Sequence, residues 1–249
     1  MQDSPLSARN ISHRFGGLVA IDRLSLDLAP GSIHAVIGTN GAGKSTLVSI
    51  LAGELAPTAG QVFMNGQDVT RWSQPRRARA GLGRSYQRTS IFPSLSVHEN
   101  CRIAAQASHQ KFWHWASPAA GCRRSAATAD RALALAGLES ECGRIAGALS
   151  HGRKRQLEIA MSLATRPRIL LLDEPLAGMG PEETEPMLAL LESLKPDHAI
   201  LLVEHDMDAV FRVSERITVM VNGGIIAQGD PAAIRANPQV QTAYLGDGS

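Results

Sequence analysis

The residues best suited to chemistry in this chain stand together in nine positions, GTNGAGKST, with three glycines and a lysine before two hydroxyl side chains. They satisfy the pattern G-x-x-x-x-G-K-[ST] through Gly38, Gly43, Lys44 and Ser45. In such a loop the backbone N–H groups converge on an anion, the lysine reaches the β- and γ-phosphates, and the hydroxyl binds Mg²⁺. We therefore predict nucleotide binding by Gly38, Thr39, Asn40, Gly41, Ala42, Gly43, Lys44, Ser45 and Thr46.

The alternative is a glycine-rich turn that only joins a strand to a helix. The residues on either side of the loop help to decide between this turn and a nucleotide site. SIHAVIG (Ser32–Gly38) is a short apolar run with β-branched residues, which predicts a strand. STLVSILAGE (Ser45–Glu54) has apolar residues at helical spacing. A phosphate-binding loop requires a strand before it and a helix after it, so both flanks favour the nucleotide site.

Two adjacent acids, Asp173 and Glu174, end the apolar run RILLLDE. Acids at a strand end are common at the rim of a sheet and alone would say little. In a chain that also holds a phosphate-binding loop, one carboxylate is suited to Mg²⁺ and the other to the water that attacks a phosphoryl group.

A second candidate anion site lies in ALSHGRKRQLEIAMSLA (Ala148–Ala164). Ser150 precedes a predicted helix, where a hydroxyl, free N–H groups and the helix dipole point the same way. An ordinary N-cap is the alternative reading of the same serine.

Strand-like and helical segments alternate through most of the chain, which predicts an α/β layered fold. The first sixty or so residues carry short alternating runs with Pro-Gly and Asn-Gly turns, which predicts an antiparallel β region. Residues 95–148 are alanine-rich and helical in pattern, and we expect a helical subdomain there. Within it, residues 109–124 are expected to form a surface loop or an irregular helix.

Composition limits the classes of partner. The 249 residues carry a net charge of +2, which is too small to argue for nucleic acid or an anionic membrane. Six arginines between residues 71 and 88 show no regular pattern of interleaved aromatic residues, and we interpret them as a solvated, partner-facing surface that binds no nucleic acid. Three cysteines without metal-site spacing are expected to be free thiols. Without a secretory signal or a membrane-length apolar run, we expect a soluble protein that reaches a membrane through a partner.

Taken in order, these motifs resemble those of the ATP-binding cassette (ABC) transporter ATPases, and the resemblance covers nearly the whole chain. It implies a P-loop NTPase of the ABC type, with a mixed, mainly parallel core sheet, an N-terminal antiparallel β region and an inserted helical subdomain. It implies one domain over residues 1–249, with a core of 1–94 and 149–249 and a subdomain of 95–148 that continues into the helix after Ser150. The implied cofactors are ATP and Mg²⁺.

The resemblance also assigns roles to residues. Phe15 stands where an aromatic ring stacks on adenine, and Gln87 where a glutamine links Mg²⁺ and the catalytic water to the helical subdomain. Asp173 would hold the metal together with Ser45, Glu174 would be the catalytic glutamate, and His205 would contact the γ-phosphate. The LSHGR segment resembles the signature motif, which would contact ATP through Ser150, His151, Gly152 and Arg153.

Members of this family form a dimer that encloses two ATP molecules, so the resemblance implies a second ATPase subunit, a copy or a paralogue. It further implies transmembrane permease subunits, a solute-binding protein acting through them, and a peripheral place on the cytoplasmic face of the plasma membrane. Within the family, the chain is most similar to the ATPase subunits of branched-chain amino-acid importers. The similarity lies in LDEPLAGMGPEE, VEHDM and the C-terminal tail. Urea or amide importers, lipid exporters and ABC regulators without a permease remain as alternatives.

Four positions depart from the family pattern. Thr39 replaces a common proline, His151 replaces a signature glycine, and Gly180 replaces a common aspartate. Arg153 stands where glutamine or glutamate is expected, and it would either strengthen contact with ATP or clash across the dimer.

Overall fold

The structure is a computed structural model that describes residues 4–86, 90–109 and 123–245. The chain divides into two compact units, one from residues 1–82, 168–174 and 195–249, and the other from residues 83–167 and 175–194.

The first unit contains an antiparallel sheet in the order β2-β1-β4-β5. Its strands are β1 (Leu6–Phe15), β2 (Leu18–Leu28), β4 (Ala59–Met64) and β5 (Gln67–Asp68). Leu6, Ala8 and Ile11 of β1 and Leu24, Leu26 and Leu28 of β2 are buried, so one face of this sheet is apolar. This is the antiparallel region that the turn signals predict.

The second sheet has the order β10-β9-β3-β8-β7-β6 and is parallel from β9 to β7. Its strands are β3 (Ser32–Gly38), β6 (Leu82–Arg84), β7 (Ile169–Asp173), β8 (Ala199–Val203), β9 (Arg216–Val221) and β10 (Gly224–Gly229), and Leu82 of β6 is where the chain leaves the first unit. Every residue of β7 and β8 is buried. Continuous apolar runs are typical of parallel strands covered on both faces, and the sequence shows this pattern.

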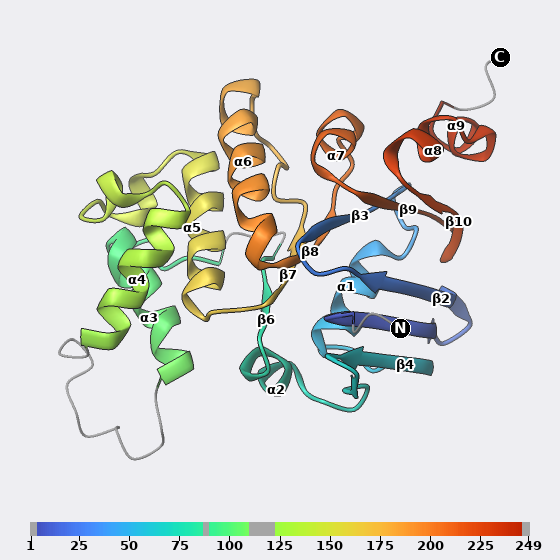
Figure 1. Ribbon diagram of the computed structural model, residues 1–249, viewed down its shortest axis with the longest axis horizontal. Helices are drawn as coiled ribbons and strands as arrows, with labels where there is room; N and C mark the ends of the chain where they lie inside the picture. The colour runs from blue at the N-terminus through green and yellow to red at the C-terminus, as the bar shows by residue number, and fades with distance from the viewer. Residues whose placement is uncertain (1–3, 87–89, 110–122, 246–249) are drawn as a thin grey trace. The chain divides into compact units, whose positions relative to one another are not determined.

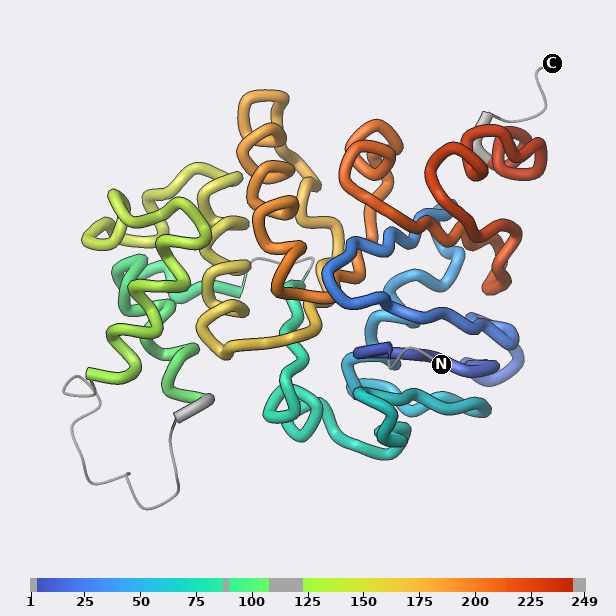
Figure 2. The backbone as a smooth tube through the Cα atoms, viewed as in Figure 1, coloured from blue at the N-terminus to red at the C-terminus, as the bar shows by residue number. Residues whose placement is uncertain are grey.

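Alternate residues of β3 face two different cores of the first unit. Val36 belongs to a cluster with α1 (Lys44–Ala52) and the antiparallel sheet, whereas Ala35 and Ile37 belong to a cluster with α7 (Met207–Val213) and the chain after it. Figure 2 follows that chain from β10 into the two last helices. These are α8 (Pro231–Arg235) and α9 (Pro238–Leu245), and α2 (Gln74–Arg79) lies between β5 and β6.

The second unit is helical apart from its share of β6 (Figure 1). Its helices are α3 (Val97–His109), α4 (Arg123–Leu135), α5 (His151–Ala164) and α6 (Pro181–Leu194), with 3-10 turns at η3 (Glu139–Glu141) and η4 (Ala146–Ala148). A further 3-10 turn, η5 (Lys195–Asp197), belongs to the first unit. Residues 110–122, most of the expected surface loop, lie outside the described part of the chain, and the two ends of that segment are helical. None of the helices in the described ranges has both the length and the apolar content needed to cross a bilayer.

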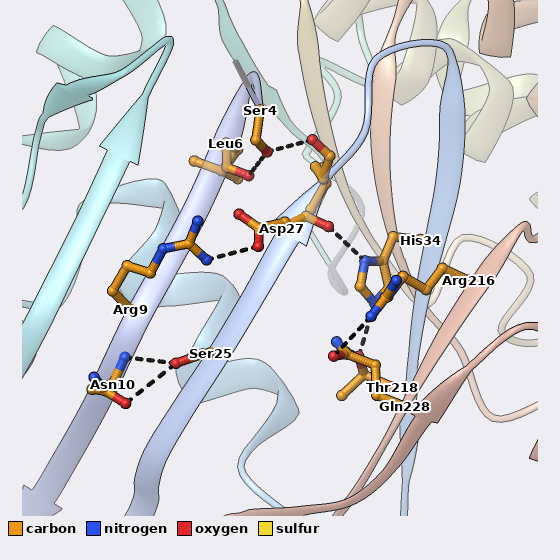
Figure 3. A network of polar contacts seen from close by, with 11 residues as sticks. Ser4, Leu6, Arg9, Asn10, Ser25, Asp27, His34, Arg216, Thr218 and Gln228 are labelled. Atoms are coloured by element: carbon orange, nitrogen blue, oxygen red, sulfur yellow. Dashed lines mark hydrogen bonds and ion pairs between the residues drawn. The ribbon is translucent and has the colours of Figure 1, made fainter. Parts of the chain in front are cut away.

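A chain of polar contacts joins the two sheets of the first unit around His34, which is 1% exposed (Figure 3). Its Nδ1 lies 3.1 Å from the backbone oxygen of Asp27 on β2, and its Nε2 lies 2.8 Å from Oγ1 of Thr218 on β9. Because the Asp27 oxygen only accepts, Nδ1 carries the proton, and in the neutral ring Nε2 then accepts from the threonine hydroxyl. Gln228 on β10 in turn donates to Thr218 at 2.8 Å. Burial lowers the pKa of the His34 imidazole to about 4, so the ring is neutral at pH 7.

One interpretation of the sequence is wrong. Arg77, one of the six arginines expected on a solvated surface, is 0% exposed. Its guanidinium donates to the carbonyl oxygens of Ile50 and Leu51 in the last turn of α1, at 2.8 and 2.7 Å, and to that of Val69 at 2.8 Å. The physical reason is that the last carbonyls of a helix need donors, and this arginine supplies them. Cys101 and Cys142 are free thiols, as expected, and Cys122 lies outside the described residues.

Candidate functional site

The glycine-rich loop joins β3 to α1, as its flanks predict. Two of its glycines have no room for a side chain, because a Cβ at Gly38 would lie 2.3 Å from the carbonyl oxygen of Met220 and one at Gly43 would lie 2.3 Å from that of Ala20. Gly43 also has a φ of 97°. The loop is therefore fixed between β9 on one side and β2 on the other.

The first turn of α1 begins directly after the loop. Gly43 occupies the N-cap and offers no side chain to its N–H groups, so these remain suited to an anion. Ser45 is exposed and Thr46 is half-buried. The loop before them is open at Asn40 and Gly41, which are exposed, while Ala42 is buried.

Lys44 is 8% exposed and reaches back over the loop. Its Nζ donates to the carbonyl oxygens of Gly38, at 2.6 Å, and Thr39, at 3.0 Å. Burial lowers the pKa of this ammonium group, while the carboxylates of Glu174 and Asp173 act in the opposite direction. Thr39 contributes its backbone oxygen here, so the loss of the common proline leaves this contact in place.

The two predicted acids lie at the carboxyl end of β7, in the same unit as the loop. Asp173 is 2% exposed and pairs with Val203 of β8 in parallel register. Val203 pairs in turn with Val36 of β3, two residues before Gly38. The acids and the loop therefore share one edge of the sheet, where ligands bind in α/β proteins.

Glu174 has a φ of 51°, in the left-handed region that a non-glycine residue rarely adopts. Its N–H donates to the carbonyl oxygen of Val203 at 2.8 Å, which holds the strained residue against β8. Such strain is concentrated at functional sites.

His205 follows β8, and its side chain is 64% exposed. Its Nδ1 lies 3.6 Å from Oε2 of Glu204, which is 0% exposed, and the same oxygen accepts from the backbone N–H of His205 at 3.1 Å. Glu204 was not predicted as a functional residue, although a carboxylate beside a candidate histidine was a readable signal. Together the contacts fix the backbone of the histidine and leave its ring open.

Phe15 ends β1 and is 52% exposed. It pairs with Leu18 at the start of β2, and Ala20, two residues further, contacts Gly43. His13 packs edge-on against the Phe15 ring, with centroids 4.5 Å apart and an interplanar angle of 72°. An exposed aromatic ring therefore stands on the hairpin that borders the phosphate loop, in keeping with a stacking role.

The signature residues belong to the second unit, at the start of α5. Ser150 is the N-cap, and its Oγ accepts from the N–H of Arg153 at 3.4 Å. His151 places Nε2 at 2.9 Å from the carbonyl oxygen of Ala177. Gly152 donates its N–H to Oε1 of Glu183 on α6 at 3.0 Å, a contact that sequence reasoning missed because 31 residues separate the two.

The guanidinium of Arg153 lies along its own unit. It donates to the carbonyl oxygen of Gly137 at 3.0 Å and to Oε1 of Gln156 at 3.1 Å. These partners hold the side chain beside the turn after α4. Arg153, which departs from the family pattern, therefore makes hydrogen bonds within its own unit.

The donor set suits Mg²⁺. The hydroxyl of Ser45 and the carboxylate of Asp173 are hard oxygen ligands, and Mg²⁺ prefers one or two such groups together with phosphates and water. Residues 4–86, 90–109 and 123–245 contain no cluster of three or more His, Cys, Asp or Glu side chains that could hold a metal ion. Gln87, predicted to act on the metal and on water, lies outside the described residues.

Comparison with known proteins agrees with the geometry. The family model described as ABC transporter matches residues 21–177, and that of the branched-chain amino acid ATP-binding cassette transporter matches residues 225–249. The chain is 38% identical over 257 residues to the high-affinity branched-chain amino acid transport ATP-binding protein LivG of Escherichia coli (strain K12), covering 99% of this chain and 100% of LivG. It is 37% identical over 250 residues to the corresponding protein BraF of Pseudomonas aeruginosa, covering 97% and 98%.

Two solved structures share the fold over nearly the whole chain. A nucleotide-free ATP-binding cassette from an ABC transporter superposes with a TM-score of 0.88 at 27% identity, covering 98% of this chain and 100% of that one. The ADP conformation of an ATP-binding cassette superposes with a TM-score of 0.88 at 28% identity, covering 98% and 99%. The predicted fold class is confirmed.

Proposed function

The chain belongs to the ABC transporter ATPases, whose general function is ATP hydrolysis, and we propose that it energises a membrane importer for branched-chain amino acids or a related small solute. The observation that carries the proposal is the Gly38–Thr46 loop sharing one sheet edge with Asp173 and Glu174. The solute class rests on the C-terminal family match and on the names of the relatives that match full-length. We propose that residues 1–249 act as one ATPase domain.

Each side chain takes a role from its position. The loop N–H groups and Lys44 bind the phosphates, and Phe15 stacks on adenine. Ser45 and Asp173 would hold Mg²⁺, which would supply positive charge to the β- and γ-phosphates. Glu174 accepts the proton of the water that attacks the γ-phosphorus, as the bond to ADP breaks. His205 contacts the γ-phosphate through its exposed ring, and Gln87 is the remaining proposed contact to metal and water.

The second anion site, at Ser150–Arg153, couples ATP binding and hydrolysis to closing and opening of a pair of ATPase subunits. We infer that Ser150–Arg153 of a facing ATPase subunit closes on the γ-phosphate, so that ATP binds the closed pair more tightly than the open one. Hydrolysis removes that preference, and the pair opens. The partner is a second copy or a paralogue, and the pair acts on permease subunits from the cytoplasmic side of the membrane.

Two measurements test the proposal. Purified protein should hydrolyse ATP only with Mg²⁺, and activity that rises faster than linearly with protein concentration would support self-pairing. Mild solubilisation of membranes should co-purify the chain with a multi-span membrane protein. If repeated purification yields no such protein, the importer assignment is wrong even if the ATPase activity is present.

A further inference from the structure

The start of α5 contacts a residue, Glu183, to which the proposed function gives no role. Its N-cap residue Ser150 and the N–H groups of the first helical turn form a site suited to an anion. In the structure this site already holds a carboxylate, because Oε1 of Glu183 accepts from the N–H of Gly152 at 3.0 Å. The hydroxyl of Ser150 also acts on the same carboxyl group and lowers its pKa.

The fit between Glu183 and the start of α5 is close. A Cβ atom at Gly152 would lie 2.8 Å from Cδ and 2.9 Å from Cβ of Glu183, so glycine is required for this contact. The hydrogen bonds from Ser150 and Gly152 lower the pKa of the Glu183 carboxyl below its usual range, and His151 adds to the effect. The group is therefore an anion at neutral pH.

Backbone contacts around the two helices keep the carboxylate in place. The N–H groups of Glu183 and Thr184 both donate to the carbonyl oxygen of Gly180 at 3.0 Å, which begins α6 beside α5. On the other side, His151 reaches the carbonyl oxygen of Ala177 at 2.9 Å. Glu183 itself is only half-buried, so its side chain is able to leave the site by rotating toward solvent.

We propose that Glu183 is an internal competitor of phosphate, which occupies the anion site of Ser150 and Gly152 until the γ-phosphate of a facing subunit's ATP displaces it. The inference rests on the proposed function, which assigns that phosphate to the same two donors. A carboxylate and a phosphate repel each other and cannot share two donors. Closure of the pair must therefore break the contacts of Glu183, and the residue sets how much ATP is needed for closure.

Removing only the negative charge isolates this role. Glu183→Gln keeps the shape of the side chain and an oxygen that accepts from Gly152, but a neutral hydrogen bond is about half as strong as a charge-assisted one. Glu182→Gln is the matched control, because it removes the same charge from an exposed neighbour on the same helix turn. Both are made in a Glu174→Gln background, and ATP-dependent association is measured by analytical ultracentrifugation.

We expect Glu183→Gln to strengthen ATP-dependent association about threefold or more and Glu182→Gln to leave it unchanged. Equal values for the two variants, or weaker association with Glu183→Gln, would overturn the inference. If the parent does not associate with ATP at all, self-pairing in the proposed function fails, and the inference is then decided by a second measurement.

That measurement follows the backbone amide resonance of Gly152 during titration with inorganic phosphate. The Glu183→Gln chain should respond at a phosphate concentration several-fold lower than the Glu182→Gln chain, because its anion site is no longer held by a charge. An identical response in both chains would show that Glu183 does not compete for the site.

Discussion

The N–H of Glu174 donates to the carbonyl oxygen of Val203 at 2.8 Å while Glu174 itself adopts a left-handed φ of 51°. The contact continues the β7–β8 pairing one residue beyond the strand. It turns the chain sharply after Asp173, so two adjacent acids at one strand end occupy different backbone conformations. This difference is suited to separate roles, one toward metal and one toward water.

The role of Glu174 toward water is testable by replacing its carboxylate with an amide of nearly the same shape. Glu174→Gln should lower the rate of ATP hydrolysis by about 10²-fold or more, because the amide cannot accept the proton of water. ATP affinity, measured by filter binding or calorimetry, should remain near that of the wild type. Hydrolysis close to the wild-type rate would remove Glu174 from the reaction.

The phosphate loop should tolerate no side chain at Gly38. Gly38→Ala brings a Cβ to 2.3 Å from the carbonyl oxygen of Met220, and relieving this clash requires β3 and β9 to move apart. We expect a loss of about 1–3 kcal/mol in the free energy of unfolding, measured with urea, and weaker ATP binding. Gly17→Ala is the control, since nothing lies within 4 Å of a Cβ there. An equal effect of both substitutions would contradict the steric argument.

Phe15 should contribute to ATP affinity through its exposed ring. Phe15→Ala is expected to weaken ATP binding about tenfold, within the usual range for a base stacked on an aromatic ring. Phe15→Trp should retain affinity. Leu18→Ala provides the comparison, because Leu18 is also exposed and lies opposite Phe15 across the hairpin. If Phe15→Ala and Leu18→Ala weaken ATP binding equally, the Phe15 ring acts only through packing.

His34 should make the fold sensitive to acid. Burial lowers the pKa of its imidazole from 6.5 to about 4, with the Asp27 backbone contact opposing this shift and Arg216 adding to it. The unfolded chain binds a proton below pH 6.5 and the native chain resists it until about pH 4, so stability falls across this window and the loss then levels off. The full loss from this group is about 3 kcal/mol.

Urea unfolding at pH 7.5, 5.5 and 4.5 measures the effect. His34→Gln should be less stable at pH 7.5, because it disturbs the contact to Thr218, but should lose less stability between pH 7.5 and 4.5 than the wild type. His198→Gln, at a half-buried position on the same unit, should retain the wild-type slope. A wild-type slope in His34→Gln would assign the acid sensitivity to other groups.

Much of the site could be read from the sequence because its chemistry is local. A phosphate loop is a run of backbone N–H groups between one strand and one helix, so Gly38, Gly43 and Lys44 identify it without knowledge of the rest of the fold. The continuous apolar run RILLLDE likewise predicted β7 and the position of Asp173 at a sheet edge.

The tertiary structure decided what depends on residues distant in the chain. Arg77 was expected in solvent, but the end of α1, more than twenty residues away, supplies the carbonyl groups that bury it. The contact of Glu183 with Gly152 and the neutral state of His34 likewise arise when separate elements pack. Sequence patterns report the periodicity of one element and the chemistry of one loop, whereas burial and long-range hydrogen bonds exist only once the elements have assembled.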